Sequence, residues 1–257
     1  MPVEKPFLRA WVLPAAVFAA AGGLWALLSS LGVLPAAVIP SPPAVIRGFG
    51  EELRAGRLFT DLVASLFRVT AGFLLAAALG LPLGLVMGQR RLVREALLPA
   101  VNFFRNVSPL AWIPFAILWF GIGDLPAIFL IFMAAFFPLA LSIMAAVAGI
   151  PSVYFRVARD FGFTSGETLA KVTLPAIAPQ VITALRVTAG LSWLVVVAAE
   201  MIVGRDGLGF AVWDARNGLR TDLLVVAMAV IGAVGIVLDW GLRQLTRVPS
   251  VRWGYER

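Results

Sequence analysis

The chain has 257 residues, of which 61% are hydrophobic and 14% are charged, and several apolar stretches are long enough to cross a bilayer as helices. The absence of cysteine and histidine excludes disulfides, thiol nucleophiles, imidazole bases and zinc sites built on these residues. The excess of 21 Lys and Arg over 14 Asp and Glu fits the retention of basic residues on the cytoplasmic side of a membrane, so nucleic-acid binding is not expected. The composition predicts an all-α membrane protein in which residues 1–257 form a single transmembrane domain.

About six transmembrane helices are predicted in chain order. The first apolar run is longer than the apolar core of a signal peptide, so we interpret it as a retained span. The third contains Pro109 and Pro114, which predict a kinked helix that faces protein or water rather than lipid. The predicted spans are residues 11–31, 69–87, 96–119, 125–148, 181–203 and 223–242.

The segments that precede and follow these spans have their own signals. Residues 34–61 are rich in proline and then in charge, which favours a short helix at the membrane surface. Residues 204–222 have the composition of a polar loop with glycines. Small residues on the second span allow close helix approach, either within the chain or across a dimer; these are Gly72, Gly80, Gly84 and Gly88.

The distribution of charge predicts the orientation. Six spans place both termini on one side, together with residues 89–95 and 151–179, and this side holds 12 basic and 5 acidic residues. The other side holds 6 basic and 7 acidic residues. Basic residues concentrate on the cytoplasmic side, so both termini and residues 151–179 are expected in the cytoplasm.

Residues 151–179, called the coupling segment below, have the pattern of two short helices joined at a glycine. Gly162 lies where the first helix would end, because glycine adopts the left-handed conformation without strain. Thr164 and Glu167 fit a capping box at the start of the second helix, and Pro175 and Pro179 predict its end. The alternative is an ordinary solvated loop, but the segment is longer than such loops and its caps predict order.

Charges inside the predicted spans need a partner or a function, because inserting one at a helix centre costs at least about 2.5 kcal/mol. Asn102, Arg105 and Asn106 share one face of the third span, with Ser108 close by, and an arginine between amides offers donors to a planar oxyanion. On the fifth span Arg186, Trp193 and Glu200 recur at intervals of seven. The candidate residues of a translocation pathway are therefore Asn102, Arg105, Asn106, Ser108, Trp193 and Glu200.

Two structural alternatives stay open for these charges. Arg105 and Glu200 could form an ion pair that holds two helices together without contacting a substrate. Asp239 and Arg243, four residues apart near the end of the sixth span, are more simply explained as a local ion pair.

The coupling segment resembles the EAA loop of ABC-importer membrane subunits, on the residues ARDFG (158–162) and VTLPAIAP (172–179). In that family the second short helix, here Glu167 to Lys171, is a coupling helix that fits a groove on the ATP-hydrolysing subunit. Arg156 stands where an acidic residue often opens the motif. The residues to which the resemblance assigns ATPase coupling are Ala158, Asp160, Gly162, Thr164, Glu167, Lys171 and Pro175.

Further motifs extend the resemblance over most of the chain and narrow it to one branch of these permeases. SPLAWIP (108–114), WFGIGD (119–124), GLSWLVVVAAEMI (190–202) and GLGF (207–210) together resemble the nitrate, taurine, sulfonate and bicarbonate branch. With VWDARN (212–217), the pattern is most similar to the nitrate and bicarbonate members. The resemblance implies a type I ABC importer permease fold and a small oxyanion or organic anion as substrate.

The same resemblance implies the partners. The chain has no G-x-x-x-x-G-K-[ST] sequence, so ATP and Mg would be bound by two separate ATP-binding cassette subunits, and neither a cofactor nor a metal is expected in this chain. A second permease copy would complete the pathway, as a homodimer or with a close relative. A periplasmic or lipid-anchored binding protein would dock on residues 40–61 and 204–222 of a subunit embedded in the lipid of a bacterial cytoplasmic (inner) membrane.

Two other functions remain as alternatives. A secondary transporter or channel for small anions would work without ATP, and it would not copurify with an ATP-binding subunit. A membrane-embedded enzyme is disfavoured, because no paired carboxylates lie on a common face and histidine is absent.

Overall fold

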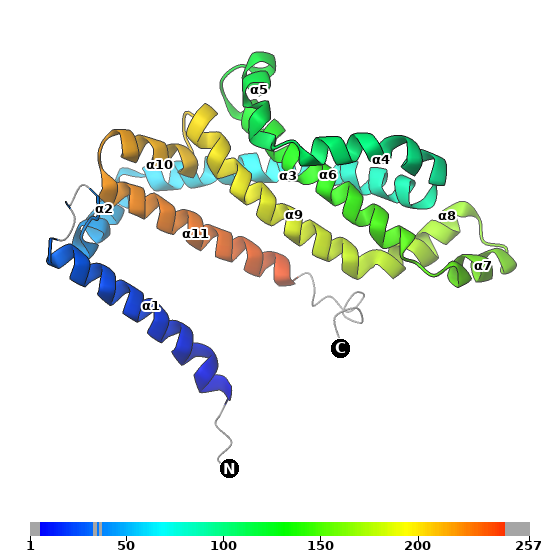
Figure 1. Ribbon diagram of the computed structural model, residues 1–257, viewed down its shortest axis with the longest axis horizontal. Helices are drawn as coiled ribbons and strands as arrows, with labels where there is room; N and C mark the ends of the chain where they lie inside the picture. The colour runs from blue at the N-terminus through cyan, green and yellow to red at the C-terminus, as the bar shows by residue number, and fades with distance from the viewer. Residues whose placement is uncertain (1–5, 33–34, 36–37, 245–257) are drawn as a thin grey trace, which may run out of the picture.

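The computed structural model describes residues 6–32, 35 and 38–244, and within these residues the chain is helical without β-strands (Figure 1). Five helices are long and apolar enough to cross a membrane, or six when one bent pair counts as a single span, which confirms the predicted all-α membrane protein. The helices are α1 (Pro6–Ser30), α2 (Pro42–Ala55), α3 (Arg57–Gln89), α4 (Arg91–Asn106), η1 (Pro109–Trp112), α5 (Ile113–Phe120), α6 (Asp124–Ala148), α7 (Ser152–Asp160), α8 (Ser165–Thr168), η2 (Leu169–Thr173), α9 (Leu174–Val203), α10 (Leu208–Asn217) and α11 (Thr221–Gln244).

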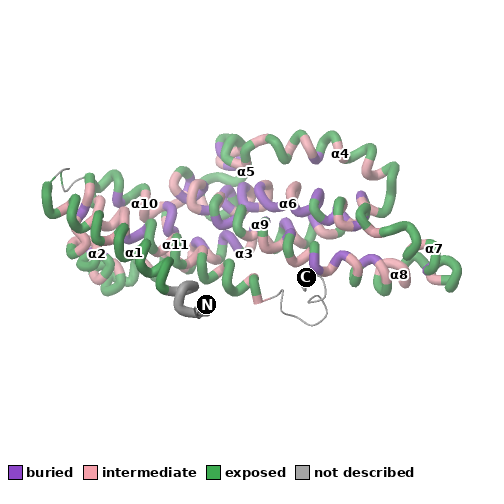
Figure 2. The backbone as a smooth tube through the Cα atoms, turned by 60° about the horizontal axis from the view of Figure 1, so that its bottom comes forward, coloured by how far each residue is buried: buried purple, intermediate pink, exposed green. Residues whose placement is uncertain are grey.

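The core lies where α3, α6 and α9 pack against one another, and Figure 2 shows most of the buried residues there. Leu139 and Ile143 of α6 are fully buried against Ile177 of α9. A Cβ on Gly72 would lie 2.7 Å from a methyl of Ile131 on α6, so this glycine sets how closely the two helices approach. Because Gly72, Gly84 and Gly88 all contact α6 of the same chain, the small-residue stripe has an intramolecular role.

The third predicted span is broken as expected. α4 and the η1–α5 unit are bent by 88° around residues 107–108, and α5 projects from the body of the molecule (Figure 1). Pro109 starts the unit after the bend, where its missing N–H is not required by a helical hydrogen bond. The turn to α6 then uses Gly121, whose φ of 74° favours glycine.

The second predicted span was placed too late. It was expected from residue 69, but α3 begins at Arg57, directly after Gly56 ends α2 in the left-handed conformation. The first turns of α3 carry the charged residues Asp61 and Arg68, and both find partners on neighbouring segments.

Residues 204–222 were interpreted as a loop, and this was incomplete. Only residues 204–207 and 218–220 are loops, because α10 occupies residues 208–217, where it buries Leu208, Gly209 and Ala215, and α11 begins at Thr221. The short helix expected within residues 34–61 is present as α2, while residues 57–61 already belong to α3.

The coupling segment has the predicted corner and cap. Gly162 adopts a φ of 73° after α7, and Thr164 and Glu167 form a complete capping box at the start of α8. Its predicted end was wrong, because α8 continues through the π-helical turn η2 into α9, and Pro175 and Pro179 lie inside that continuous helical stretch. Pro175 is accommodated at the start of α9, where the missing N–H is tolerated.

Helix α1 matches the first predicted span but lies apart from the bundle (Figure 1). None of the residues in its apolar window is buried. Trp25 attaches its end to the following segment by donating from Nε1 to the carbonyl of Pro40 at 3.0 Å. Residues 1–5 and 245–257, which hold the two termini predicted to be cytoplasmic, lie outside the described residues.

Gly84→Ala will lower the free energy of unfolding by about 1–3 kcal/mol, because the new methyl group overpacks the contact with α6. A Cβ at this position would lie 2.6 Å from the carbonyl oxygen of Ala140 and 2.7 Å from Cβ of Ile143. Gly241→Ala is the matched control, since nothing lies within 4 Å of a Cβ there. Thermal unfolding of the detergent-solubilised chain measures both, and equal melting temperatures would contradict the close approach of α3 and α6.

Candidate functional site

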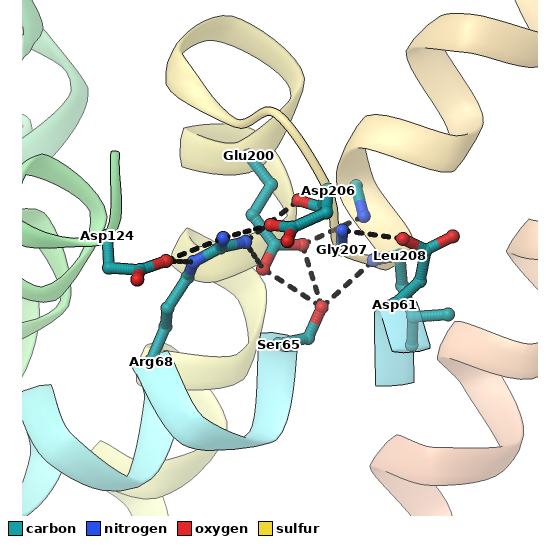
Figure 3. Close-up of polar contacts among 9 residues, drawn as sticks. Asp61, Ser65, Arg68, Asp124, Glu200, Asp206, Gly207 and Leu208 are labelled. Atoms are coloured by element: carbon teal, nitrogen blue, oxygen red, sulfur yellow. Dashed lines mark hydrogen bonds and ion pairs between the residues drawn. The ribbon is translucent and has the colours of Figure 1, made fainter. Parts of the chain in front are cut away.

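A group of buried polar side chains lies at the end of the bundle that carries α10 (Figure 3). Arg68 and Ser65 come from α3 and Glu200 from α9, and their exposed fractions are 3%, 1% and 0%. The segment between α9 and α10 closes over them. We call this set the Arg68 cluster; its members are Asp61, Ser65, Arg68, Asp124, Glu200 and Asp206.

The guanidinium of Arg68 is fully engaged. Nη1 donates to Oε1 of Glu200 and to the backbone carbonyl of Asp206, each at 2.8 Å. Nε donates to Oδ1 of Asp124 at 2.7 Å, and the guanidinium also forms an ion pair with the Asp206 carboxylate. One arginine therefore connects α3 with the start of α6, with α9 and with the segment before α10, which suits the fixed geometry of its donors.

The Glu200 carboxylate receives hydrogen bonds from three directions. Besides Arg68, Ser65 Oγ lies 2.8 and 2.9 Å from its two oxygens, and the backbone N–H of Gly209 donates to Oε2 at 2.9 Å. Ser65 Oγ also accepts from the backbone N–H of Leu208 at 2.9 Å. A buried carboxylate is tolerated when it is paired and its lone pairs are used in this way.

Two glycines allow the backbone to close over this carboxylate. Gly207 has a φ of 106°, and a Cβ there would lie 2.5 Å from the Glu200 carboxylate. A Cβ on Gly209 would lie 2.3 Å from the carbonyl oxygen of Val197. Glycine is therefore required at 207 by the turn and by the Glu200 carboxylate. At 209 it is required by the close contact with α9.

The chemistry of the Arg68 cluster is structural. Arg68 pairs with Glu200, Asp124 and Asp206, and Asp61 accepts from the backbone N–H of Gly207. Leaving the buried Arg68 or Glu200 unpaired would cost several kcal/mol. No group of three or more metal-ligating side chains occurs in the described part of the chain. The cluster therefore joins segments rather than exposing a reactive or ligand-binding group.

A second ion pair connects α9 with α11. Arg186 Nε and Nη2 donate to the two oxygens of Asp239 at 2.7 and 2.9 Å. Arg243 lies 3.8 Å from the same carboxylate, so the expected local pair is confirmed, while the closer partner on α9 was not predicted.

The candidate pathway residues divide into two separate places. Arg105, Asn106 and Ser108 are exposed around the end of α4, where Asn106 donates its amide to the backbone carbonyl of Asn102 at 2.9 Å. Trp193 and Glu200 are buried in α9, and Trp193 donates to the carbonyl of Ile231 at 3.3 Å. Glu200 pairs with Arg68, so the alternative of an Arg105–Glu200 pair is wrong.

Sequence reasoning missed Arg68 itself. A usable signal was present, because Asp61, Ser65 and Arg68 recur at helical spacing and all face the cluster. A span that begins at residue 69 excludes all three of these residues.

The coupling segment presents an ordered polar surface. The Thr164 N–H donates to Glu167 Oε2 at 3.0 Å, the Glu167 N–H donates to Thr164 Oγ1 at 3.3 Å, and Lys171 contacts Glu167 Oε1 at 3.0 Å. Ala158 is buried, and its carbonyl accepts from the N–H of Phe163 at 2.9 Å. The exposed members of the predicted coupling set are Asp160, Gly162, Thr164, Lys171 and Pro175.

Comparison with known proteins decides the family. Residues 80–247 match the family model described as "Binding-protein-dependent transport system inner membrane component". The chain belongs to this family of ABC transporter permeases. Its relatives are named as permease subunits of ABC transporters.

Two relatives illustrate the similarity. The taurine transport system permease protein TauC of Escherichia coli (strain K12) is 34% identical over 229 residues, which are 87% of this chain and 83% of that protein. The bicarbonate transport system permease protein CmpB of Synechococcus elongatus is 40% identical over 183 residues, 71% of this chain and 66% of that protein.

The fold agrees with a solved permease. A chain from an inward-facing structure of the MetNI methionine ABC transporter has a TM-score of 0.60 and 21% sequence identity, over 76% of this chain and 99% of that one. The predicted type I importer permease fold is thereby confirmed.

Ser65→Ala will destabilise the permease by about 1–3 kcal/mol, because it leaves the buried Leu208 N–H without an acceptor and removes a contact to Glu200. Ser142→Ala on α6 is the matched control, since that exposed hydroxyl bonds only to the Pro138 carbonyl of its own helix. Melting temperatures of the two purified variants test this, and no difference between them would show that Ser65 does not support the loop.

Proposed function

We propose that this permease is the membrane-spanning subunit of an ATP-driven importer for a small oxyanion or organic anion of the nitrate, bicarbonate, taurine or sulfonate class. The proposal that transport is driven by ATP rests on helix α8. This helix is capped and exposed, and it continues through η2 into the core helix α9. A force applied at Thr164 to Lys171 acts on a long helical stretch rather than on a flexible loop. The names of TauC and CmpB support the substrate class.

The proposed assembly follows the family. Two permease copies, as a homodimer, would form the pathway, and two ATP-binding cassette subunits would bind ATP and Mg. The termini and coupling segment would face the cytoplasm across the inner membrane. The opposite end, with α2 and α10, would receive a periplasmic or lipid-anchored binding protein.

The proposed mechanism transmits motion through α9. Closure of the ATP-binding subunits would displace the surface formed by Thr164, Glu167 and Lys171, and the displacement would pass along α9. At its far end Glu200 is joined to Arg68 of α3, so α9 and α3 would move together. The Arg186–Asp239 pair would include α11 in the same moving unit.

The pathway would be lined from the α4 side. Arg105, Asn106 and Ser108 are exposed, and Asn102 lies beside them, so these side chains can present donors to a passing oxyanion. Trp193 and Glu200, which were also candidates, are buried within one subunit and would act by supporting the helices.

Glu167→Lys will reduce substrate-stimulated ATP hydrolysis by the reconstituted complex at least about tenfold, because it removes the helix cap and reverses a charge on the docking surface. Glu95→Lys is the matched control, because Glu95 is exposed and, like Glu167, forms an ion pair with a basic residue of its own helical segment, here Arg91. Complex recovery by affinity purification shows that the variants assemble. Unchanged coupled hydrolysis in Glu167→Lys would refute the coupling role.

Arg105→Gln will lower the initial rate of anion uptake into proteoliposomes at least about tenfold, because a charge-assisted contact to the anion is lost. Arg91→Gln removes an equal charge from the other end of α4 and should leave uptake unchanged. The assay uses labelled nitrate, bicarbonate, taurine and an alkylsulfonate in turn. Equal rates for the two variants with every transported anion would place the pathway elsewhere.

The ATP-independent alternative is tested with the same material. A secondary transporter or channel would move the anion in liposomes that contain this chain alone, whereas an importer subunit requires the ATP-binding subunits and ATP.

A further inference from the structure

A cavity of about 500 Å³ lies beneath the coupling segment, where it joins the body of the molecule. Figure 1 shows that the start of α4, α7 and α8 lie at this same end. The cavity is lined from the ends of α3 and α6, from α4, α7 and α8, and from the π-helical turn. We call it the junction cavity; its polar lining residues include Gln89, Arg94, Ser152, Arg159, Ser165 and Thr168.

The charge of the junction cavity is positive. Arg94 and Arg159 line it, and no carboxylate is among its lining residues. The acidic side chains Glu95 and Glu167 from neighbouring turns are engaged elsewhere, with Arg91 and Lys171. Within the described residues neither Arg94 nor Arg159 forms an ion pair, so two arginines line the cavity without a charged partner.

The neutral lining completes the chemistry. Ser152, Ser165 and Thr168 supply hydroxyl groups and Gln89 an amide, and these can donate hydrogen bonds beside the two guanidinium groups. Phosphate- and sulfonate-like groups carry several acceptor oxygens and are bound preferentially by arginine. The volume is sufficient for such a group, and the combination of two arginines with three hydroxyls matches it better than it matches a cation or an apolar ligand.

We propose that the junction cavity binds a tetrahedral oxyanion through Arg94 and Arg159. The anion joins α4 of the body to α7 of the coupling segment, which otherwise meet here without a direct ion pair. Its source is either free phosphate or sulfate, or the headgroup of an anionic phospholipid, because both present the same oxygens. An anion in the cavity restrains the coupling segment. The effect of this restraint on transport rests on the proposed coupling role, whereas the binding itself does not.

Binding of inorganic phosphate to the purified full-length chain in detergent tests the first source, with ionic strength held constant by chloride. Calorimetric titration should show saturable binding that is weakened at least about tenfold in Arg94→Gln and in Arg159→Gln. Arg91→Gln and Arg156→Gln are matched controls on the same two helices, since neither side chain lines the cavity, and they should change affinity by less than about twofold.

The lipid source is tested in nanodiscs that contain phosphatidylcholine and phosphatidylglycerol. Native mass spectrometry of the released chain should then show retained phosphatidylglycerol that Arg94→Gln and Arg159→Gln lose and the two controls keep. Melting temperatures measured without added anion show whether the variants fold. Arg94→Lys, which retains the charge, is a second control against a folding defect. Selective loss in either experiment supports the site and names its source. Loss in neither experiment, or equal loss in the controls, overturns the proposal, and neither result depends on ATP coupling.

Discussion

The buried ion pair of Arg68 and Glu200 is the interaction on which the arrangement of this permease depends. Both charges lie in the interior of a membrane protein, where each is tolerated only because the other is present. Through the same guanidinium, Asp124 and Asp206 fix the start of α6 and the segment before α10. Gly207 follows from the pair, because a side chain there would displace the Glu200 carboxylate, whereas Gly209 allows the backbone to approach Val197 of α9.

The two ends of the bundle therefore differ in physical character. The end with α10 is held by a dense set of charged hydrogen bonds, and α2 is attached there by Arg220, which contacts Glu51 and Asp222. The opposite end carries the exposed α7 and α8, whose local caps hold their shape while the junction cavity separates them from the body. This contrast suits a subunit that receives a displacement at one end and transmits it through α9 to the other.

The parts that the sequence predicted are those determined by neighbouring residues. Gly162 and the Thr164–Glu167 box are local signals, and the spans follow from runs of apolar residues. The Arg68–Glu200 pair joins residues 132 apart, and no periodicity indicates which of several charges meet. Pro175 predicts a helix end, but it lies at the start of α9 after a π-helical turn, and such a turn has no clear sequence signature.

A double-mutant cycle on Arg68→Met and Glu200→Leu tests the central claim most directly, with the free energy of unfolding measured in detergent. Each single substitution leaves one buried charge without its main partner, and a loss of about 3–5 kcal/mol is expected for each. The double variant should lose at least about 2 kcal/mol less than the sum of the two, because the charges are removed together. Additive losses would show that the two residues are independent and would contradict the account.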